Sequence, residues 1–260
     1  ATITTYMFTN ANAVTHAGTY RAVVTNANGF TNSGTAVVSI SIPAGSIVNA
    51  FAPGSGTPIV TTAHGVSIDS AGRYLMLSTT ALRRLGADGV LEPTTSFGIN
   101  VSGGTSVLAM PDGRAIVAGN LSIPYTHLPS NTTSNLSTRI FRVNNDATGT
   151  IDSTWSVFVN GPVTALALGD SAKFYVGSSG APTSTNGIQR FNADGTTDAT
   201  WVPTVNTIAA GTGGTVHLIR ELADGKVLIS HRHGSSSSGT YRLTRLNSNG
   251  TIDTTFGTNG

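Results

Sequence analysis

The sequence contains no cysteine and few charged residues. Without cysteine there can be no disulfide bond, no thiol nucleophile and no zinc site built on thiolates. Asp, Glu, Lys and Arg together make up 10% of the chain, whereas an ordinary soluble domain has about 25%. The polar surface must therefore come mainly from uncharged side chains. Such a surface is typical of proteins that work outside the cytoplasm, so we predict an extracellular or cell-surface location.

Long basic runs and long apolar runs are also missing. The net charge is +2 at pH 7, and no Lys/Arg run exceeds the pair Arg83–Arg84, so nothing in the sequence follows a phosphate backbone. No apolar stretch approaches the roughly 18 residues that span a bilayer. The motifs G-x-S-x-G, H-E-x-x-H and G-x-x-x-x-G-K-[ST] do not occur. We predict no nucleic-acid partner, no membrane span and no cofactor.

The chain does contain one motif in four copies. Each copy has an arginine, a turn with one glycine, an acidic residue three positions after that glycine, and a closing aromatic residue. The copies are Arg84, Gly89, Glu92 and Phe97; Arg142, Gly149, Asp152 and Trp155; Arg190, Gly195, Asp198 and Trp201; and Arg245, Gly250, Asp253 and Phe256. The closing aromatics lie 58, 46 and 55 residues apart, a spacing typical of stacked or radially arranged repeats.

An equally regular segment precedes each copy. It reads as an alternating strand, a tight turn, a basic residue and a nearly apolar strand, and it occupies residues 65–77, 106–119, 163–177 and 216–231. Asp-Gly between alternating runs favours a hairpin, and the apolar runs favour strands covered on both faces. We therefore predict an all-β fold in which four propeller-type, four-stranded blades follow one another.

The two halves together resemble the delta-60 repeat, in which a D-G-K/R turn and an apolar strand are followed by R-h-N-x-D-G-x-x-D-x-x-F/W. The resemblance covers roughly residues 48–260. It implies a bacterial surface or secreted protein that forms a β-propeller, often beside immunoglobulin-like modules, and more than four blades in a complete propeller. The departures are Glu92 with its longer Pro93-containing tail, Arg142 two residues further from its glycine, and Asp170-Ser171 in place of Asp-Gly.

Residues 1–42 differ from the repeats and are followed by a predicted linker at residues 43–47. Their alternating apolar pattern predicts strands at residues 1–8, 18–25 and 35–42. Asn26–Gly29 is a hairpin signal. The segment resembles the last three strands of an immunoglobulin-like domain, with Tyr20 as the corner tyrosine and Ala22 in place of the second cysteine. Three such strands are marginal alone, so we expect another chain or segment to complete them by strand addition.

Eleven of the twelve acidic residues recur in register with the repeats. Asp and Asn at such positions accept hydrogen bonds from turn amides. The arginine and the post-turn acid of each copy lie on strands that flank one hairpin, near enough to pair. Only Glu221 lies outside the pattern. Because acid–base catalysis needs two carboxylates in unlike environments, we predict that the protein is not an enzyme.

Two groups of side chains have the composition of a metal site. The first is a calcium candidate formed by Asn192, Asp194 and Asp198. Capping of their own turn explains these residues better, because calcium wants six to eight oxygens. The second contains His231 and His233 on one face of a strand, which His217 could join only through folding. A catalytic zinc normally needs three protein ligands, so we predict no metal.

These features favour a non-enzymatic structural or adhesive protein, a component of a bacterial cell surface, appendage or fibre that assembles through strand edges and loops. Its partners would be copies of itself, neighbouring domains of a longer chain, and surface glycans. The alternative is a lectin-like propeller that binds a ligand beside the polar insertions at residues 122–137 and 235–239. A carbohydrate-active enzyme is the third hypothesis.

Overall fold

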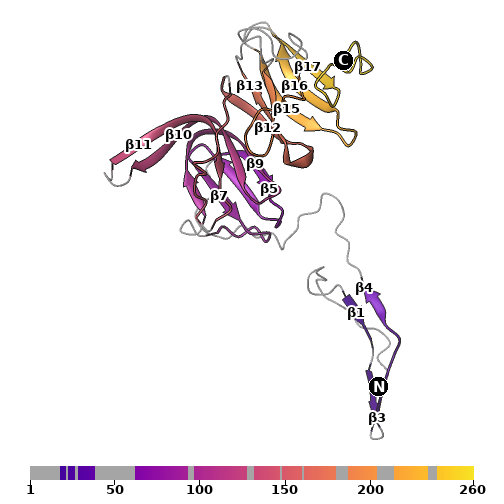
Figure 1. Cartoon of the computed structure of the whole chain (residues 1–260). Helices are drawn as coiled ribbons and strands as arrows, with labels where there is room; N and C mark the ends of the chain where they lie inside the picture. The colour runs from indigo at the N-terminus through magenta and orange to yellow at the C-terminus, as the bar shows by residue number, and fades with distance from the viewer. Residues whose placement is uncertain are drawn as a thin grey trace. The chain divides into compact units, whose positions relative to one another are not determined.

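A computed structural model describes residues 18–21, 23–26, 29–38, 62–92, 97–127, 132–146, 148–159, 161–179, 187–203, 214–233 and 239–260. The chain divides into two compact units, Ala1–Ala50 and Phe51–Gly260 (Figure 1). The described residues form strands and turns with one short 3-10 helix, which confirms the all-β prediction. In this part of the chain, no helix is long and apolar enough to cross a bilayer.

The first unit contains two separate strand pairs. Its strands are β1 (Gly18–Tyr20), β2 (Val23–Asn26), β3 (Gly29–Asn32) and β4 (Ala36–Val38). β1 pairs with β4 and β2 with β3, both antiparallel. The β2–β3 hairpin forms at the predicted turn, where Gly29 has a φ of +136°. The predicted strand at residues 1–8, the linker at 43–47 and Ala22 lie outside the described residues. The immunoglobulin-like assignment is not confirmed.

The second unit contains one antiparallel sheet for each repeat. Sheet 1 is β5 (Ala63–Ile68), β6 (Tyr74–Ser78), β7 (Ala81–Leu85) and β8 (Gly98–Asn100); sheet 2 is β9 (Ser102–Ala109), β10 (Ala115–His127) and β11 (Thr132–Val143); sheet 3 is β12 (Val163–Leu168), β13 (Phe174–Ser178) and β14 (Ile188–Phe191); sheet 4 is β15 (Thr215–Glu221), β16 (Val227–His233) and β17 (Thr240–Leu246). Strand order follows chain order in every sheet. The four sheets are consistent with propeller-like blades.

The first hairpin of each repeat is set by its turn residues. In repeats 2 and 4, Gly113 and Gly225 have φ values of +83° and +76°, a left-handed conformation that glycine adopts without steric strain. The third repeat lacks this glycine. Its turn is the 3-10 helix η1 (Asp170–Ala172), in which Ala172 is forced to a φ of +59°. The predicted departure at Asp170-Ser171 therefore changes the turn but leaves the hairpin in place.

Among the described residues, the predicted fourth strand is reduced in every repeat to a single antiparallel bridge: Leu85 with Leu91, Val143 with Ile151, Phe191 with Thr197, and Leu246 with Ile252. The fourth strand of sheet 1, β8, begins only after the closing aromatic Phe97. The acid that follows ends the strand. In repeat 2, Asp152 Oδ1 accepts a hydrogen bond from the Thr154 N–H at 3.0 Å, and the Trp155 N–H donates to the Asp152 carbonyl at 3.4 Å. The chain turns here instead of continuing along β11.

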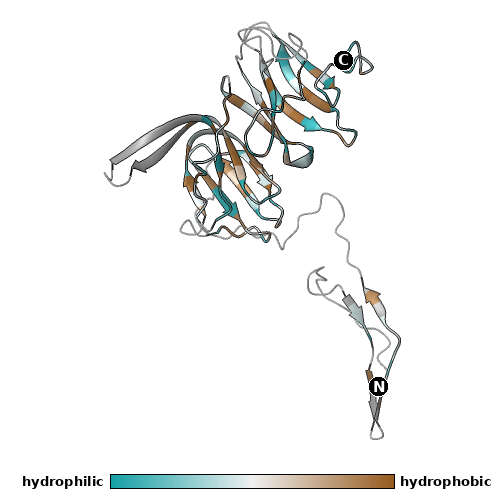
Figure 2. Cartoon of the chain, viewed as in Figure 1, coloured by the Kyte–Doolittle hydropathy of each residue, from teal (hydrophilic) through white to brown (hydrophobic). Residues whose placement is uncertain are grey.

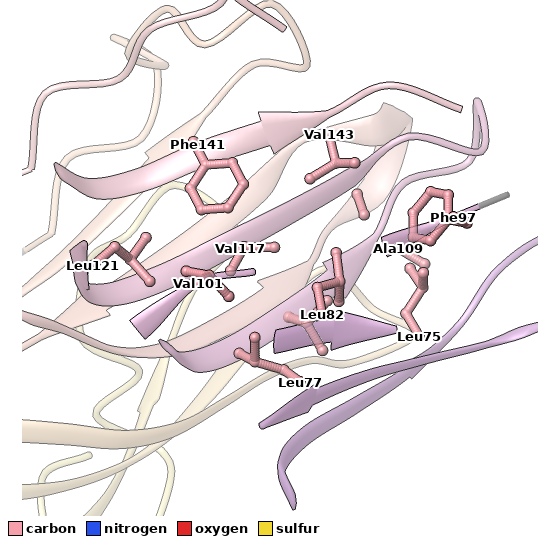
Figure 3. Packing of buried hydrophobic residues seen from close by; sticks show 12 residues of the cluster. Leu75, Leu77, Leu82, Phe97, Val101, Ala109, Val117, Leu121, Phe141 and Val143 are labelled. Carbon is pink, nitrogen blue, oxygen red and sulfur yellow. The ribbon is translucent and has the colours of Figure 1, made fainter. Parts of the chain in front are cut away.

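Each hydrophobic core lies between two consecutive sheets, and the apolar residues that build it alternate along the strands in Figure 2. The core between sheets 1 and 2 includes Leu77, Leu82, Val107, Val117 and Phe141 (Figure 3). Two further clusters join sheet 2 to sheet 3 and sheet 3 to sheet 4. The first strands of successive sheets, β5, β9, β12 and β15, lie next to one another. No sheet therefore has a core of its own.

The predicted insertion at residues 122–137 lengthens one hairpin. Pairing between β9 and β10 ends at Ser102 with Ser122, whereas β10 and β11 remain paired as far as His127 with Thr132. The two strands continue past the rest of sheet 2 as a two-stranded arm (Figure 1).

Candidate functional site

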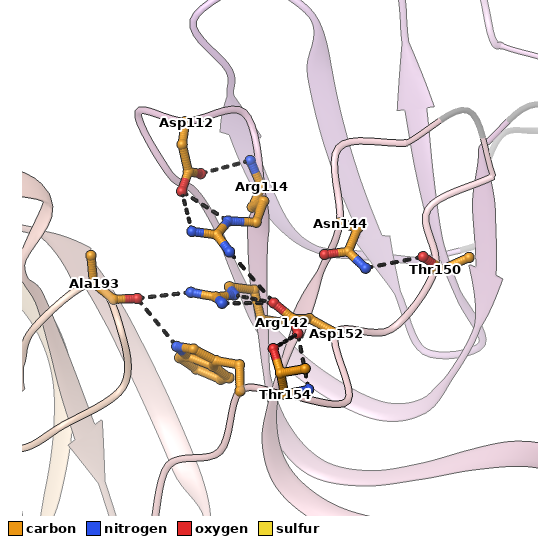
Figure 4. Close-up of polar contacts among 9 residues, drawn as sticks. Asp112, Arg114, Arg142, Asn144, Thr150, Asp152, Thr154 and Ala193 are labelled. Carbon is orange, nitrogen blue, oxygen red and sulfur yellow. Dashed lines mark hydrogen bonds and ion pairs between the residues drawn. The ribbon is translucent and has the colours of Figure 1, made fainter.

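Each repeat joins its arginine to its post-turn acid. The closest nitrogen–oxygen distances are 2.8 Å for Arg84–Glu92, 2.6 Å for Arg142–Asp152, 2.8 Å for Arg190–Asp198 and 2.7 Å for Arg245–Asp253. The side chains of Arg142 and Asp152 are both buried (Figure 4). A buried charge needs a partner of opposite sign, and the repeat supplies the partner eight to ten residues away.

A second cation reaches the same acid in three repeats. Arg114, Lys173 and Lys226, from the first turns, lie 3.5, 2.7 and 2.9 Å from the carboxylates of Asp152, Asp198 and Asp253. The recurrence of a basic residue after the first turn was visible in the sequence. Its partner was not, because the two turns of a repeat meet only when the sheet forms.

The closing aromatic lies against the same arginine. The guanidinium carbon is 3.9 to 5.7 Å from the ring centroid in the pairs Arg84–Phe97, Arg142–Trp155, Arg190–Trp201 and Arg245–Phe256, within the range of a cation–π contact. In repeat 2, Arg142 and the Trp155 indole both donate to the Ala193 carbonyl, at 2.8 and 3.2 Å (Figure 4). The motif thus fastens one sheet to the turn of the next.

These acids are held in their ionised form. Hydrogen bonds from Thr154 and Arg142 lower the pKa of Asp152 to about 2. Burial would raise the pKa of Asp198, but hydrogen bonds from Lys173 and Thr200 outweigh it and hold that pKa far below its usual range. A general acid needs a pKa near the working pH, so neither carboxyl is suited to donate a proton at neutral pH.

The three residues of the calcium candidate bond within their own repeat. Asn192 Nδ2 donates to Thr196 Oγ1 at 2.9 Å, and Asp194 Oδ1 accepts from the Thr196 N–H at 2.9 Å. Asp198 Oδ2 is taken by Arg190 and Lys173. Within the described ranges, no three His, Asp or Glu side chains lie together as a metal site.

The histidines of sheet 4 lie in different surroundings. His231 is fully buried, with Nε2 at 2.9 Å from Thr244 Oγ1. Burial, with smaller contributions from the charges of His233 and Arg242, lowers the pKa of His231 to about 4. His217 is exposed, and its ring centroid lies 5.6 Å from that of Tyr241. Of the two histidines predicted to share one face of the strand, His231 is therefore buried and His233 is partly exposed.

A groove of about 400 Å³ lies between the first strands of sheets 3 and 4. It is lined by Leu166, Ala167 and Leu168 of β12 and by Ile219, Arg220 and Glu221 of β15. More of the exposed lining is polar than apolar. Arg220 and Glu221 are consecutive residues of β15, so their side chains lie on opposite faces of sheet 4, that of Glu221 toward sheet 3. Sequence reasoning singled out Glu221 but gave no sign of the groove.

The two charged residues of the groove differ in how they are held. Glu221 accepts a hydrogen bond from the Asp170 N–H at 3.3 Å and bonds to the Tyr175 hydroxyl. Burial and this carboxylate raise the pKa of Tyr175 to about 12. A Cβ at Gly169 would lie 2.6 Å from Glu221 Oε2, so glycine leaves room for the carboxylate. Arg220 is exposed and forms no ion pair with any described residue.

Solved structures with a similar arrangement of strands include an enzyme. A gluconolactonase from Xanthomonas campestris is 18% identical with a TM-score of 0.46, and the match covers 73% of this chain and 60% of that structure. A protein of unknown function from Bacteroides caccae is 14% identical with a TM-score of 0.36, covering 74% and 80%. A protein from Lactobacillus plantarum is 17% identical with a TM-score of 0.29, covering 88% and 64%. No curated protein matches the sequence.

The likeness to the gluconolactonase contradicts our prediction of a non-enzymatic structural or adhesive component, because an enzyme has a similar strand arrangement. That prediction had rested on the repeated positions of the acidic residues and on the incomplete strands of residues 1–42, which describe the architecture of the chain and not its activity. At this identity, the likeness transfers neither an activity nor a substrate to the present chain.

The family comparison concerns the two C-terminal repeats. Residues 174–200 and 222–256 match the family described as "Domain of unknown function (DUF5122) beta-propeller". These ranges contain the arginine and the post-turn acid of repeats 3 and 4 and the basic residue of repeat 4, Lys226. This match confirms the predicted resemblance to a delta-60-type repeat for repeats 3 and 4, which are similar to the repeats of that β-propeller family.

Proposed function

We propose that the chain is a ligand-binding β-propeller module and that its ligand is an acidic sugar, bound in the groove between β12 and β15. The observation that carries the proposal is Arg220, an exposed arginine among the residues that line this groove. A free guanidinium presents a planar set of donors that matches a carboxylate. By contrast, the four repeat arginines already form ion pairs with the post-turn acids of their own repeats.

The other groups of the groove fit the rest of such a ligand. Leu168, which is 40% exposed, offers apolar surface to the C–H face of a sugar ring. Glu221 is fixed by the Asp170 N–H and the Tyr175 hydroxyl, and its remaining lone pairs can accept from sugar hydroxyls. A volume of about 400 Å³ is at the lower end of the range for small-molecule sites.

In this proposal the module binds its ligand without converting it. The acids of the described repeats are paired with cations or cap turns, which leaves Glu221 as the carboxylate nearest to the groove's ligand. We further propose that each of the four sheets is one propeller blade and that residues 1–42 belong to an immunoglobulin-like module. The extracellular location stays a prediction, which fractionation of the source cells tests.

Isothermal titration with D-glucuronate and D-glucose tests the binding site. We expect glucuronate to bind and glucose to bind at least about tenfold more weakly, because loss of a hydrogen bond between charged groups costs about 1.5–3 kcal/mol. Arg220→Ala should lose this preference. Arg139→Ala removes an exposed arginine of sheet 2 and should leave binding unchanged.

Equal affinity for the two sugars, or glucuronate binding that survives Arg220→Ala, would contradict the proposed site. Proton NMR of the same mixture checks the second part of the proposal. Conversion of the sugar, or of its lactone above the rate in protein-free buffer, would show that the module is an enzyme.

A further inference from the structure

The four sheets form a series with two uncovered ends. We call the face of a sheet toward the following repeat its leading face and the opposite face its trailing face. In sheet 4 the leading face carries the row Leu218–Ser230–Leu243, and in sheet 1 the trailing face carries the row Val66–Met76–Arg83. The question is what covers these two rows.

Corresponding positions inside the series are buried. Leu243 is 53% exposed, whereas its counterparts Leu82, Ile140 and Ile188 are 0%, 5% and 0% exposed. At the other end, Val66 is 57% exposed, whereas its counterpart Val107 is 7% exposed. Apolar residues thus persist at positions where the described residues offer them no neighbour. A soluble monomer seldom leaves such faces open.

A hydrogen bond from a side chain of one sheet to a carbonyl of the next sheet recurs at each of the three junctions between consecutive sheets. We call it the polar link. β5, β12 and β15 each carry a bulge, and β9 has a register shift at the matching place. The side chain there bonds to a carbonyl of the next sheet: His64 Nδ1 to Gly104 at 2.8 Å, Thr105 Oγ1 to Val163 at 2.8 Å and Thr164 Oγ1 to Val216 at 2.5 Å. The next donor in the series is the exposed His217, and the carbonyl that begins the series is that of Ala63.

A second link follows the same rule. The repeat arginine donates to a carbonyl in the second turn of the next repeat, Arg142 to Ala193 at 2.8 Å and Arg190 to Ser248 at 3.4 Å. The next donor in this series is Arg245, and the matching carbonyl of the first repeat is that of Ala87. Sheet 4 therefore ends the series with two donors, and sheet 1 begins it with the two matching carbonyl acceptors. Each of these ends also carries an apolar row.

We propose that a second copy of this chain covers both ends, with sheet 4 of each copy packed on sheet 1 of the other. His217 would bond to the Ala63 carbonyl, Arg245 to the Ala87 carbonyl, and Leu243 would pack on Val66. A contact between two different faces closes into a ring when the rotation permits. Two chains of four sheets give eight blades, within the range of known propellers.

One position of the leading face carries a larger apolar side chain in sheet 4 than in the other sheets. Leu218 occupies the position of Gly65, Ser106 and Ala165 in the other sheets. Joining two separate chains loses translational and rotational freedom, which internal junctions of one chain do not. A larger apolar side chain at this position supplies additional buried area to offset that loss.

Size-exclusion chromatography with light scattering tests the proposal on the whole chain. The expected mass is twice 26.5 kDa. Leu243→Glu on the leading face and Val66→Glu on the trailing face should each raise the dimer dissociation constant by at least tenfold, because each damages both junctions of a homodimer. Phe158→Glu, at an exposed apolar residue away from both rows, is the matched control and should remain dimeric. Circular dichroism confirms that the variants fold.

Mixing the two variants distinguishes this arrangement from other dimers. One junction in the mixed dimer joins the intact sheet 4 of V66E to the intact sheet 1 of L243E, so the mixture should contain dimers that neither variant forms alone. A monomeric wild type, dimers that resist Val66→Glu, no recovery on mixing, or assemblies that grow with concentration would each overturn the proposal. Arg220 lies on the same leading face as Leu218, so sugar binding is measured separately, on the monomeric Leu243→Glu variant as well as on the wild type.

Discussion

At the scale of single residues, the two turn acids of a repeat have different roles. Asp194 Oδ1 accepts from the Thr196 N–H at 2.9 Å, and Asn249 Oδ1 accepts from the Thr251 N–H at 3.0 Å in the same way. This position needs an acceptor but no charge. The post-turn position instead faces two cations in repeats 2, 3 and 4. Its negative charge is therefore required.

Neutralising the two acids should have unequal effects. Asp152→Asn leaves the buried Arg142 charge without its ion pair, and we expect the free energy of unfolding to fall by about 2–3 kcal/mol, somewhat less than for a fully enclosed pair. Asp194→Asn reproduces the natural Asn249 turn and should leave the denaturation midpoint nearly unchanged. Urea denaturation followed by tryptophan fluorescence measures both. Equal effects would contradict the distinction.

The buried His231 should make stability depend on pH. Its pKa is about 4 in the folded protein and about 6.5 in the unfolded chain, so the unfolded state binds more protons between these values. The stabilisation is complete above pH 6.5 and is lost as the pH falls toward 4, by up to about 3 kcal/mol. We expect urea denaturation at pH 7.5, 5.5 and 4.5 to show this decline.

The contribution of His231 is isolated by comparing variants. His231→Gln should weaken the decline in stability between pH 6.5 and 4.5, because the titrating ring is gone. His217→Gln, at an exposed histidine of the same sheet, should keep the wild-type slope. A His231→Gln slope equal to that of the wild type would show that the carboxylates alone cause the decline.

At the scale of the elements, glycines of the second turns set how closely neighbouring sheets approach. A Cβ at Gly149 would lie 2.8 Å from the Phe97 ring, and one at Gly195 would lie 2.9 Å from both the Ser156 carbonyl and Trp155 Nε1. Real Cβ atoms do not approach so closely. The turn of one repeat therefore packs directly on the closing aromatic of the preceding repeat, which ties the glycine and the aromatic of the motif to one junction.

Replacing these turn glycines with alanine should distinguish the free-energy cost of backbone strain from the cost of overpacking. Gly225 and Gly195 both have positive φ, which costs alanine about 1–2 kcal/mol. A Cβ at Gly225 would have 3.4 Å to its nearest neighbour, so Gly225→Ala should show this strain alone. Gly195→Ala should cost about 1–3 kcal/mol more, because it also overpacks the junction. Equal denaturation midpoints for the two variants would contradict the packing argument.

At the scale of the whole repeat unit, stability comes from junctions and not from single sheets. Each core cluster draws on two consecutive sheets, as in other repeat proteins, where each unit is stabilised by its neighbours. The two ends of the series must then be either adapted to water or covered. Their exposed valine and leucine residues favour covering, which is the physical basis of the proposed two-chain ring.

The sequence by itself determined the strands, the hairpins and the number of repeats described here. Turn chemistry acts over a few residues, so Asp-Gly and the glycine at positive φ specify a hairpin without help from distant parts of the chain. The pairing of Arg142 with Asp152 was predictable for the same reason, because both flank one turn. The missing fourth strands were not predicted, because the competing Asp152 turn and the β-pairing have similar sequence signals.

Only the tertiary structure decided which groups meet across repeats. Arg114 reaches Asp152 from 38 residues away, and the groove of Arg220 is formed by two strands about 50 residues apart in the chain. The burial of His231 likewise depends on sheet 3 packing over it. Such contacts depend on how sheets stack, which alternation along a strand does not encode, and the function depends on them.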